Sequence, residues 1–88
     1  MVKGHAGKIA VISGAASGIG QAMAVRLAED GVDIAIADLQ PADETVRRIT
    51  ELGRRAISRS CDVSDPQDVQ RFADHILREL GRCDILVN

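Results

Sequence analysis

The sequence of 88 residues contains no tyrosine and no tryptophan, and Phe72 is its only aromatic residue. No tyrosine in this chain can therefore act as a proton donor or acceptor, which excludes any reaction that needs one from these residues alone. The sequence also lacks a large excess of charge of either sign, since its net charge is −2. Neither a nucleic acid nor a membrane surface is an expected partner of such a chain.

Long apolar runs are absent too, since no segment approaches the ~20 residues that span a bilayer. Residues 1–7 contain no apolar stretch of the kind that a signal peptide requires. Cys61 and Cys83 form no C-x-x-C pair, and neither His5 nor His75 has a partner at metal-ligand spacing. We therefore expect a cytoplasmic protein with reduced, packed thiols and without a metal site.

What the sequence does contain is an alternation of strand-like and helix-like segments, in a composition that is 45% hydrophobic and 27% charged. Such alternation predicts an α/β fold with a parallel sheet. Apolar runs predict strands at 8–13, 33–38, 56–63 and 84–88. Helical periodicity predicts helices at 18–30, from Pro41 to Gly53, and from Asp65 to Gly81. In the first helix, we expect the apolar residues Ile19, Ala22, Met23 and Leu27 to form the buried face.

Right-handed crossovers then give the strand order 3-2-1-4 of a doubly wound sheet. In this order the chain reverses direction across the sheet between the first and fourth strands, and ligands bind at the carboxyl ends of the strands there. The segment Ser13-Gly14-Ala15-Ala16-Ser17-Gly18-Ile19-Gly20 and the terminal Asn88 both lie at this crevice.

The glycine-rich segment joins a buried strand to a helix, which is how α/β folds present backbone N–H groups to a phosphate. Its spacing is G-x-x-x-G-x-G, with Ser13 before the first glycine. We assign Ser13, Gly14, Ser17, Gly18, Ile19 and Gly20 to cofactor binding. The alternative is a turn whose glycines only allow close packing of the helix on the strand.

Asp38 ends the second predicted strand, 18 residues after Gly20, close to the ~20 expected of the acid that binds a ribose diol. A carboxylate there repels a 2′-phosphate, and neither the turn nor Leu39 and Gln40 provides a cation to relieve this. The sequence therefore favours NAD over NADP, with Leu39 beside the cofactor. Alternatively, Asp38 only caps the following helix.

This combination resembles the short-chain dehydrogenase/reductase family, whose pattern is Thr-Gly-x-x-x-Gly-x-Gly; Ser13 stands at the Thr position. Asp62 and Val63 match the family's Asp-Val pair beside the adenine, and Asn88 matches the first residue of its Asn-Asn-Ala-Gly motif. Alone, Asp62 could be a simple turn residue. The resemblance covers nearly the whole chain and implies a Rossmann-type fold.

The resemblance implies that residues 1–88 are the N-terminal, cofactor-binding part of a longer NAD-dependent oxidoreductase, a homodimer or homotetramer acting on a carbonyl or secondary alcohol. The family's catalytic Ser, Tyr and Lys would follow Asn88, so we expect the 88-residue chain to be inactive alone. The segments 33–38 and 81–88 are also similar to aryl secondary-alcohol dehydrogenases. Two alternatives remain: a non-catalytic nucleotide sensor, and a domain that binds S-adenosylmethionine.

Overall fold

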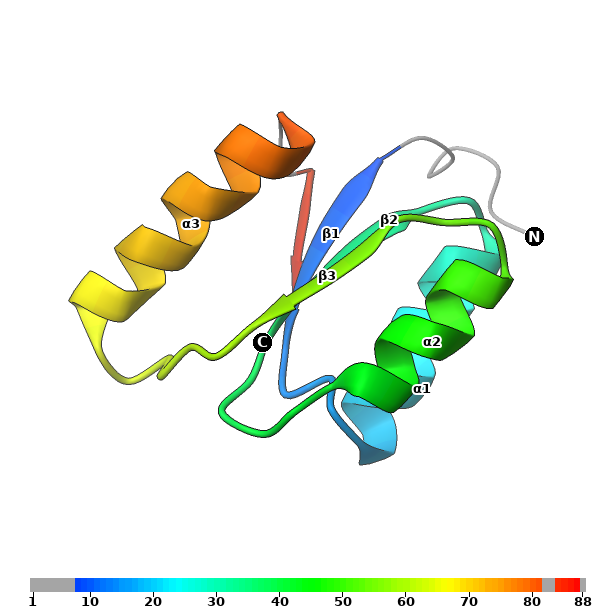
Figure 1. Ribbon diagram of the computed structural model, residues 1–88, viewed down its shortest axis with the longest axis horizontal. Coiled ribbons are helices and arrows are strands. Elements are labelled where there is room, and N and C mark those ends of the chain that lie inside the picture. The colour runs from blue at the N-terminus through cyan, green and yellow to red at the C-terminus, as the bar shows by residue number, and fades with distance from the viewer. Residues whose placement is uncertain (1–7, 82–83, 88) are drawn as a thin grey trace.

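The computed structural model describes residues 8–81 and 84–87 and contains a four-stranded parallel sheet with helices on both faces (Figure 1). The element order confirms the predicted alternation of strands and helices. In chain order the elements are β1 (Ile9–Ser13), α1 (Gly18–Glu29), β2 (Asp33–Ala37), α2 (Asp43–Glu51), β3 (Ala56–Arg59), α3 (Pro66–Leu80) and β4 (Ile85–Val87). Among the described residues, no helix is long and apolar enough to cross a membrane.

The strand order is β3-β2-β1-β4, as predicted. β1 pairs with β2 from Ile9 opposite Asp33 to Ser13 opposite Ala37, so both strands end at the same level. β1 and β2 lie inside the sheet and are apolar and buried, whereas β3 is a half-exposed edge. Because all strands are parallel, the loops after β1, β2 and β3 leave the sheet on the same side, at the carboxyl ends of the strands (Figure 1).

Each face of the sheet has its own apolar core, because successive strand residues point to opposite faces. α1 and α2 contact each other on one face, and α3 lies on the other (Figure 1). The α1–α2 side buries Ala10, Ile12, Ala24, Ala28, Ile34, Ile36 and Ile49. The α3 side buries Val11, Ala35, Ala37, Cys61, Phe72 and Ile76. Cys61 is thus a packed thiol, and burial, followed by the nearby carboxylates, raises its pKa.

The predicted buried face of α1 is wrong in part, although Leu27 does pack against the core as predicted. Ile19 is 80% exposed and Met23 is 39% exposed, whereas Ala24 and Ala28 are buried. Gly20 lies one turn before Ala24, so small residues at i, i+4 and i+8 face the sheet and let the helix approach closely. The Ile19 and Met23 side chains lie on the outward side.

Several predicted boundaries are also wrong by a few residues. β3 ends at Arg59 instead of Val63, and residues 60–65 form a loop. α2 begins at Asp43 after the N-cap Ala42, so Pro41 precedes the helix instead of starting it. β4 is described as Ile85–Val87, and Asn88 and Cys83 lie outside the described residues, as does His5. The predicted start and end of α3 are confirmed: Asp65 accepts a hydrogen bond from Gln67 N, and Gly81 caps the helix with φ +84°.

A buried threonine joins α2 to the turn that follows β1. Thr45 is 0% exposed, and its hydroxyl donates a 2.8 Å hydrogen bond to the Ala15 carbonyl. The same oxygen accepts a 2.8 Å hydrogen bond from Gln21 Nε2 on α1. Ala15 is itself fully buried, so its carbonyl has no water to replace this donor. The glycine turn is therefore held by a side chain from each of two helices.

At the opposite end of β2, Asp33 forms a buried ion cluster. Its carboxylate is 6% exposed and lies 2.9 Å from Arg54 Nη2 and 2.9 Å from Arg55 Nε. Arg55 N adds a 2.9 Å hydrogen bond to Oδ1. Burial alone raises the pKa of Asp33, but the hydrogen bonds from Arg55 and Arg54 outweigh it and hold the pKa below its usual 3.8. This cluster fixes the loop between α2 and β3 against β2.

Replacing Thr45 with valine should destabilise the fold, because the substitution keeps the shape but leaves the Ala15 carbonyl and the Gln21 amide without their partner. We expect a loss of about 1–3 kcal/mol in the free energy of unfolding, measured by urea titration. T50V is the matched control, since Thr50 lies on the same helix but is exposed. Equal losses in both variants would contradict a special role for Thr45.

Asp33→Asn should lower stability by about 1–3 kcal/mol near neutral pH. The folded pKa of Asp33 is depressed, so its contribution is present above the unfolded value of about 3.9 and is lost as pH falls through the folded value. Urea unfolding of both proteins across a pH series should therefore give a constant difference down to about pH 4 that shrinks below it. D74N, at an exposed position on α3, should show neither effect. A difference that persists unchanged in acid would contradict this assignment.

Candidate functional site: a glycine turn and two strand-end carboxylates

The glycine turn places unpaired backbone donors at the carboxyl edge of the sheet. Gly14 has φ +71° and Gly18 has φ +62°, a region that side chains disfavour. A Cβ at either position would meet nothing within 4 Å, so open space lies beside both. Gly20 is different, because a Cβ there would lie 2.2 Å from the Gly14 carbonyl oxygen. Two glycines thus permit the turn, and the third permits the close approach of α1.

The N-terminus of α1 begins directly after this turn. Ser17 is the N-cap in extended conformation, and its side chain makes no capping hydrogen bond. The first amide paired within the helix is Gln21 N, which donates to Ser17 O at 3.3 Å. The preceding amides of Gly18, Ile19 and Gly20 have no carbonyl partner in the helix. These amides and the positive end of the helix dipole favour an anionic group here.

Asp38 lies next to this turn and is bonded to it. Its Oδ2 accepts a 3.0 Å hydrogen bond from Ala16 N, and its Oδ1 accepts a 2.9 Å hydrogen bond from Gln40 N. Each carboxylate oxygen can accept a second hydrogen bond. The alternative that Asp38 caps α2 is not supported, because the N-cap of α2 is Ala42 without a side-chain cap. A hydrogen-bond acceptor is therefore fixed beside the phosphate-type donors of the turn.

Asp62 and Val63 lie in the loop after β3. Asp62 Oδ1 accepts from Ser64 N at 3.0 Å and from Ser64 Oγ at 2.6 Å, and these bonds lower the pKa of Asp62. Asp68 Oδ2 accepts a 2.7 Å hydrogen bond from Asp62 N, which ties the loop to the first turn of α3. The pKa of Asp68 is lowered by this bond and by Arg71. Asp62 is thus a charged carboxylate in a loop of defined shape.

An open hollow of about 260 Å³ brings most of these residues together. It is lined by Ser13, Gly14, Ala37, Asp38, Leu39, Cys61, Asp62 and Val63. Leu39 is 64% exposed and Val63 is 59% exposed, although both are large apolar side chains. Two exposed apolar side chains beside two carboxylates, in a hollow whose lining is largely apolar, suit a flat, partly apolar ligand.

Four other predicted site residues lie at the start of α1 and do not line this hollow: Ser17, Gly18, Ile19 and Gly20. Asn88 lies outside the described residues. Sequence reasoning missed Thr45, Gln21 and Ser64, which hold the turn and the Asp62 loop. Thr45 lies one turn before the buried Ile49, which is consistent with its burial, but its bond to the Ala15 carbonyl has no signal in the sequence. No cluster of metal-ligating side chains occurs in the part of the chain that the structure describes.

The chain is similar in sequence to known proteins. The family model described as short chain dehydrogenase matches residues 8–88. A 2-dehydro-3-deoxy-D-gluconate 5-dehydrogenase of Dickeya dadantii is 42% identical over 82 residues, covering 93% of this chain and 32% of that protein.

The fold of the chain is also similar to those of solved dehydrogenase structures. A hydroxysteroid dehydrogenase from Escherichia coli matches with a TM-score of 0.90 and 36% identity, covering 96% of this chain and 37% of that one. Carveol dehydrogenase from Mycobacterium avium in complex with NAD matches with a TM-score of 0.86 and 37% identity, covering 92% of this chain and 34% of that one. The chain spans about a third of the length of the curated relatives that it matches. With its doubly wound sheet and glycine turn, the chain belongs to the short-chain dehydrogenase/reductase family.

Proposed function

We propose that residues 1–88 are the N-terminal, cofactor-binding part of an NAD-dependent oxidoreductase that transfers a hydride between nicotinamide and a carbonyl or secondary alcohol. The observation that carries this proposal is the hydrogen bond from Ala16 N to Asp38 Oδ2 at 3.0 Å. This bond fixes the Asp38 carboxylate, which would accept hydrogen bonds from the ribose, relative to the backbone N–H groups that would donate to the diphosphate. Neither a simple packing turn nor a helix cap needs that link.

The residues present fit NAD. The open space beside Gly14 and Gly18 leaves room for a diphosphate against the backbone, where Ser17, Ile19 and Gly20 would donate hydrogen bonds. Asp38 would accept from the ribose hydroxyls. When bound, NAD supplies the nicotinamide that accepts or releases the hydride.

The adenine would lie in the hollow between Leu39 and Val63. The Asp62 carboxylate and the Val63 backbone N–H would then supply an acceptor and a donor for its polar edge. Ser13 lines the inner end of the hollow. Asn88, which follows β4, would border the crevice on its other side.

The preference for NAD over NADP rests on the charges around Asp38. The turn contributes Ala15, Ala16 and Ser17, and Leu39 and Gln40 follow Asp38, so none of these offers a cation to a 2′-phosphate. The Arg59 guanidinium, on the adjacent strand, donates to His75 on α3 instead.

We further propose a cytoplasmic homodimer or homotetramer. The relatives carry the names of different substrates, so only the reaction class is proposed. The aryl-alcohol resemblance stays a prediction.

Two observations separate this proposal from its alternatives. A Tyr-x-x-x-Lys motif in the sequence of the whole protein after residue 88 supports an enzyme, whereas its absence supports a nucleotide sensor. If S-adenosylmethionine displaces NAD in a competition titration, the result would support a domain that binds S-adenosylmethionine and contradict the assignment of NAD. The named relatives are all dehydrogenases, which favours the enzyme.

In the full-length protein, Asp38→Ala should raise the Kd for NAD by about 10-fold or more, because hydrogen bonds to a charged acceptor are lost. Affinity for NADP should fall less or rise, since repulsion of the 2′-phosphate is removed. Fluorescence titrations with both cofactors measure the change. D43A, which removes an exposed carboxylate at the start of α2, is the control. An unchanged ratio of the two affinities would remove Asp38 from the ribose-binding role.

The purified 88-residue chain should produce no NADH from any alcohol, because it has no tyrosine to act as the acid or base. Absorbance of NADH measures this directly, with the full-length protein as the positive control. Turnover above the buffer rate would show that the chain carries a different catalytic group.

A further inference from the structure

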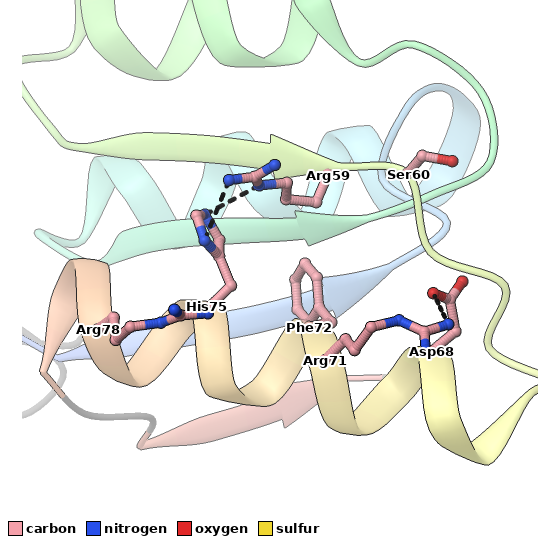
Figure 2. A pocket seen from close by; sticks show the side chains of 7 residues that line it. All are labelled: Arg59, Ser60, Asp68, Arg71, Phe72, His75 and Arg78. Carbon is pink, nitrogen blue, oxygen red and sulfur yellow. Dashed lines mark hydrogen bonds and ion pairs between the residues drawn. The ribbon is translucent and has the colours of Figure 1, made fainter.

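A second hollow of about 260 Å³ lies between the end of β3 and α3, away from the glycine turn (Figure 2). Its polar lining consists of Arg59, Ser60, Asp68, Arg71, His75 and Arg78, and the buried ring of Phe72 forms an apolar wall. We call it the arginine hollow. It shares no lining residue with the hollow assigned to adenine.

The charges in the arginine hollow are not balanced. Arg71 is paired with Asp68 at 3.0 Å, which neutralises both groups. Arg59 and Arg78 have no carboxylate partner among the described residues. Every other arginine that the structure describes does have one: Arg26, Arg47, Arg48, Arg54 and Arg55. The two unpaired guanidinium groups thus border one hollow in a chain of net charge −2.

Arg59 has unused donors even though it contacts His75. Its Nε donates to His75 Nε2 at 3.0 Å, and its Nη2 lies 3.1 Å from His75 Nδ1 (Figure 2). A neutral imidazole has one acceptor nitrogen, whereas a guanidinium has five N–H donors. His75 therefore orients Arg59 without neutralising it. Arg78 lies three residues after His75 on α3, close enough along the helix to serve the same ligand.

We propose that the arginine hollow binds the phosphate group of a small anionic ligand. Arg59 and Arg78 would supply charge-assisted hydrogen bonds, and Ser60 would supply a hydroxyl. The hollow, of about 260 Å³, has room for a phosphate group. Free phosphate and a phosphate monoester share this chemistry, so both are used as probes.

Isothermal titration calorimetry of the full-length protein at about pH 8, where histidine is ordinarily neutral, tests the proposal. Inorganic phosphate and glycerol phosphate are titrated with and without saturating NAD, because the glycine turn also attracts phosphate. We expect one phosphate site to persist when NAD is saturating. In the R59Q/R78Q variant that site should weaken by about 10-fold or more.

R47Q/R48Q is the matched control, since it removes the same charge from exposed, carboxylate-paired positions on α2 and should leave phosphate binding unchanged. If the double variant does not fold, R78Q alone repeats the test. Equal phosphate affinity in R59Q/R78Q and the parent protein, or no saturable heat at all, would overturn the proposal. Tighter binding of glycerol phosphate than of inorganic phosphate would identify a monoester as the ligand. Loss of NAD binding in the parent protein would contradict the proposed function and leave this comparison intact.

Discussion

The close approach of Gly20 to the Gly14 carbonyl is the constraint on which the rest of the site depends. A Cβ at Gly20 would lie 2.2 Å from that oxygen, so any side chain there would push α1 away from the turn. With the helix in place, its unpaired amides face the same space as the turn. Ala24 and Ala28 continue the small face along the sheet. The geometry of the phosphate-type site is thus set by packing, not by a charged side chain.

Two side chains from separate elements then hold the turn at that position. Thr45 supplies the donor for the buried Ala15 carbonyl, and Asp38 accepts from the Ala16 amide. Successive residues of the turn are thus fixed from α2 and from the end of β2. Asp38 would then have two tasks, since the carboxylate that we propose to bind ribose also orients the glycine turn through Ala16 N. A change at Asp38 is therefore expected to alter both the proposed ribose site and the conformation of the glycine turn at the proposed diphosphate site.

Much of this fold could be predicted from the sequence, because strand, turn and helix signals agree along the chain. The elements, the strand order and the cap at Asp65 followed from local patterns. The buried face of α1 did not, because apolar periodicity selects large residues such as Ile19, whereas close packing on the sheet selects small ones. Thr45 was missed for a related reason: its partner, the Ala15 carbonyl, is 30 residues away and belongs to the backbone. Contacts of this kind have no signature in the local pattern.

The two hollows also illustrate how one short chain separates opposite charge preferences. The charged side chains around the adenine hollow are both carboxylates, Asp38 and Asp62, which would suit the hydroxyl and amino donors of a nucleoside. The phosphates of the nucleotide that we propose would meet backbone amides instead. Around the arginine hollow the cations are side chains of β3 and α3. Arg59 belongs to the latter because it points to the same face of the sheet as Ile57, where α3 packs, and His75 then orients its guanidinium. If that guanidinium instead faced Asp38, it would offset the charge of the carboxylate that we propose to discriminate against a 2′-phosphate. The contact between Arg59 and His75 therefore holds the guanidinium on the α3 side and leaves donors for the second anion that we propose.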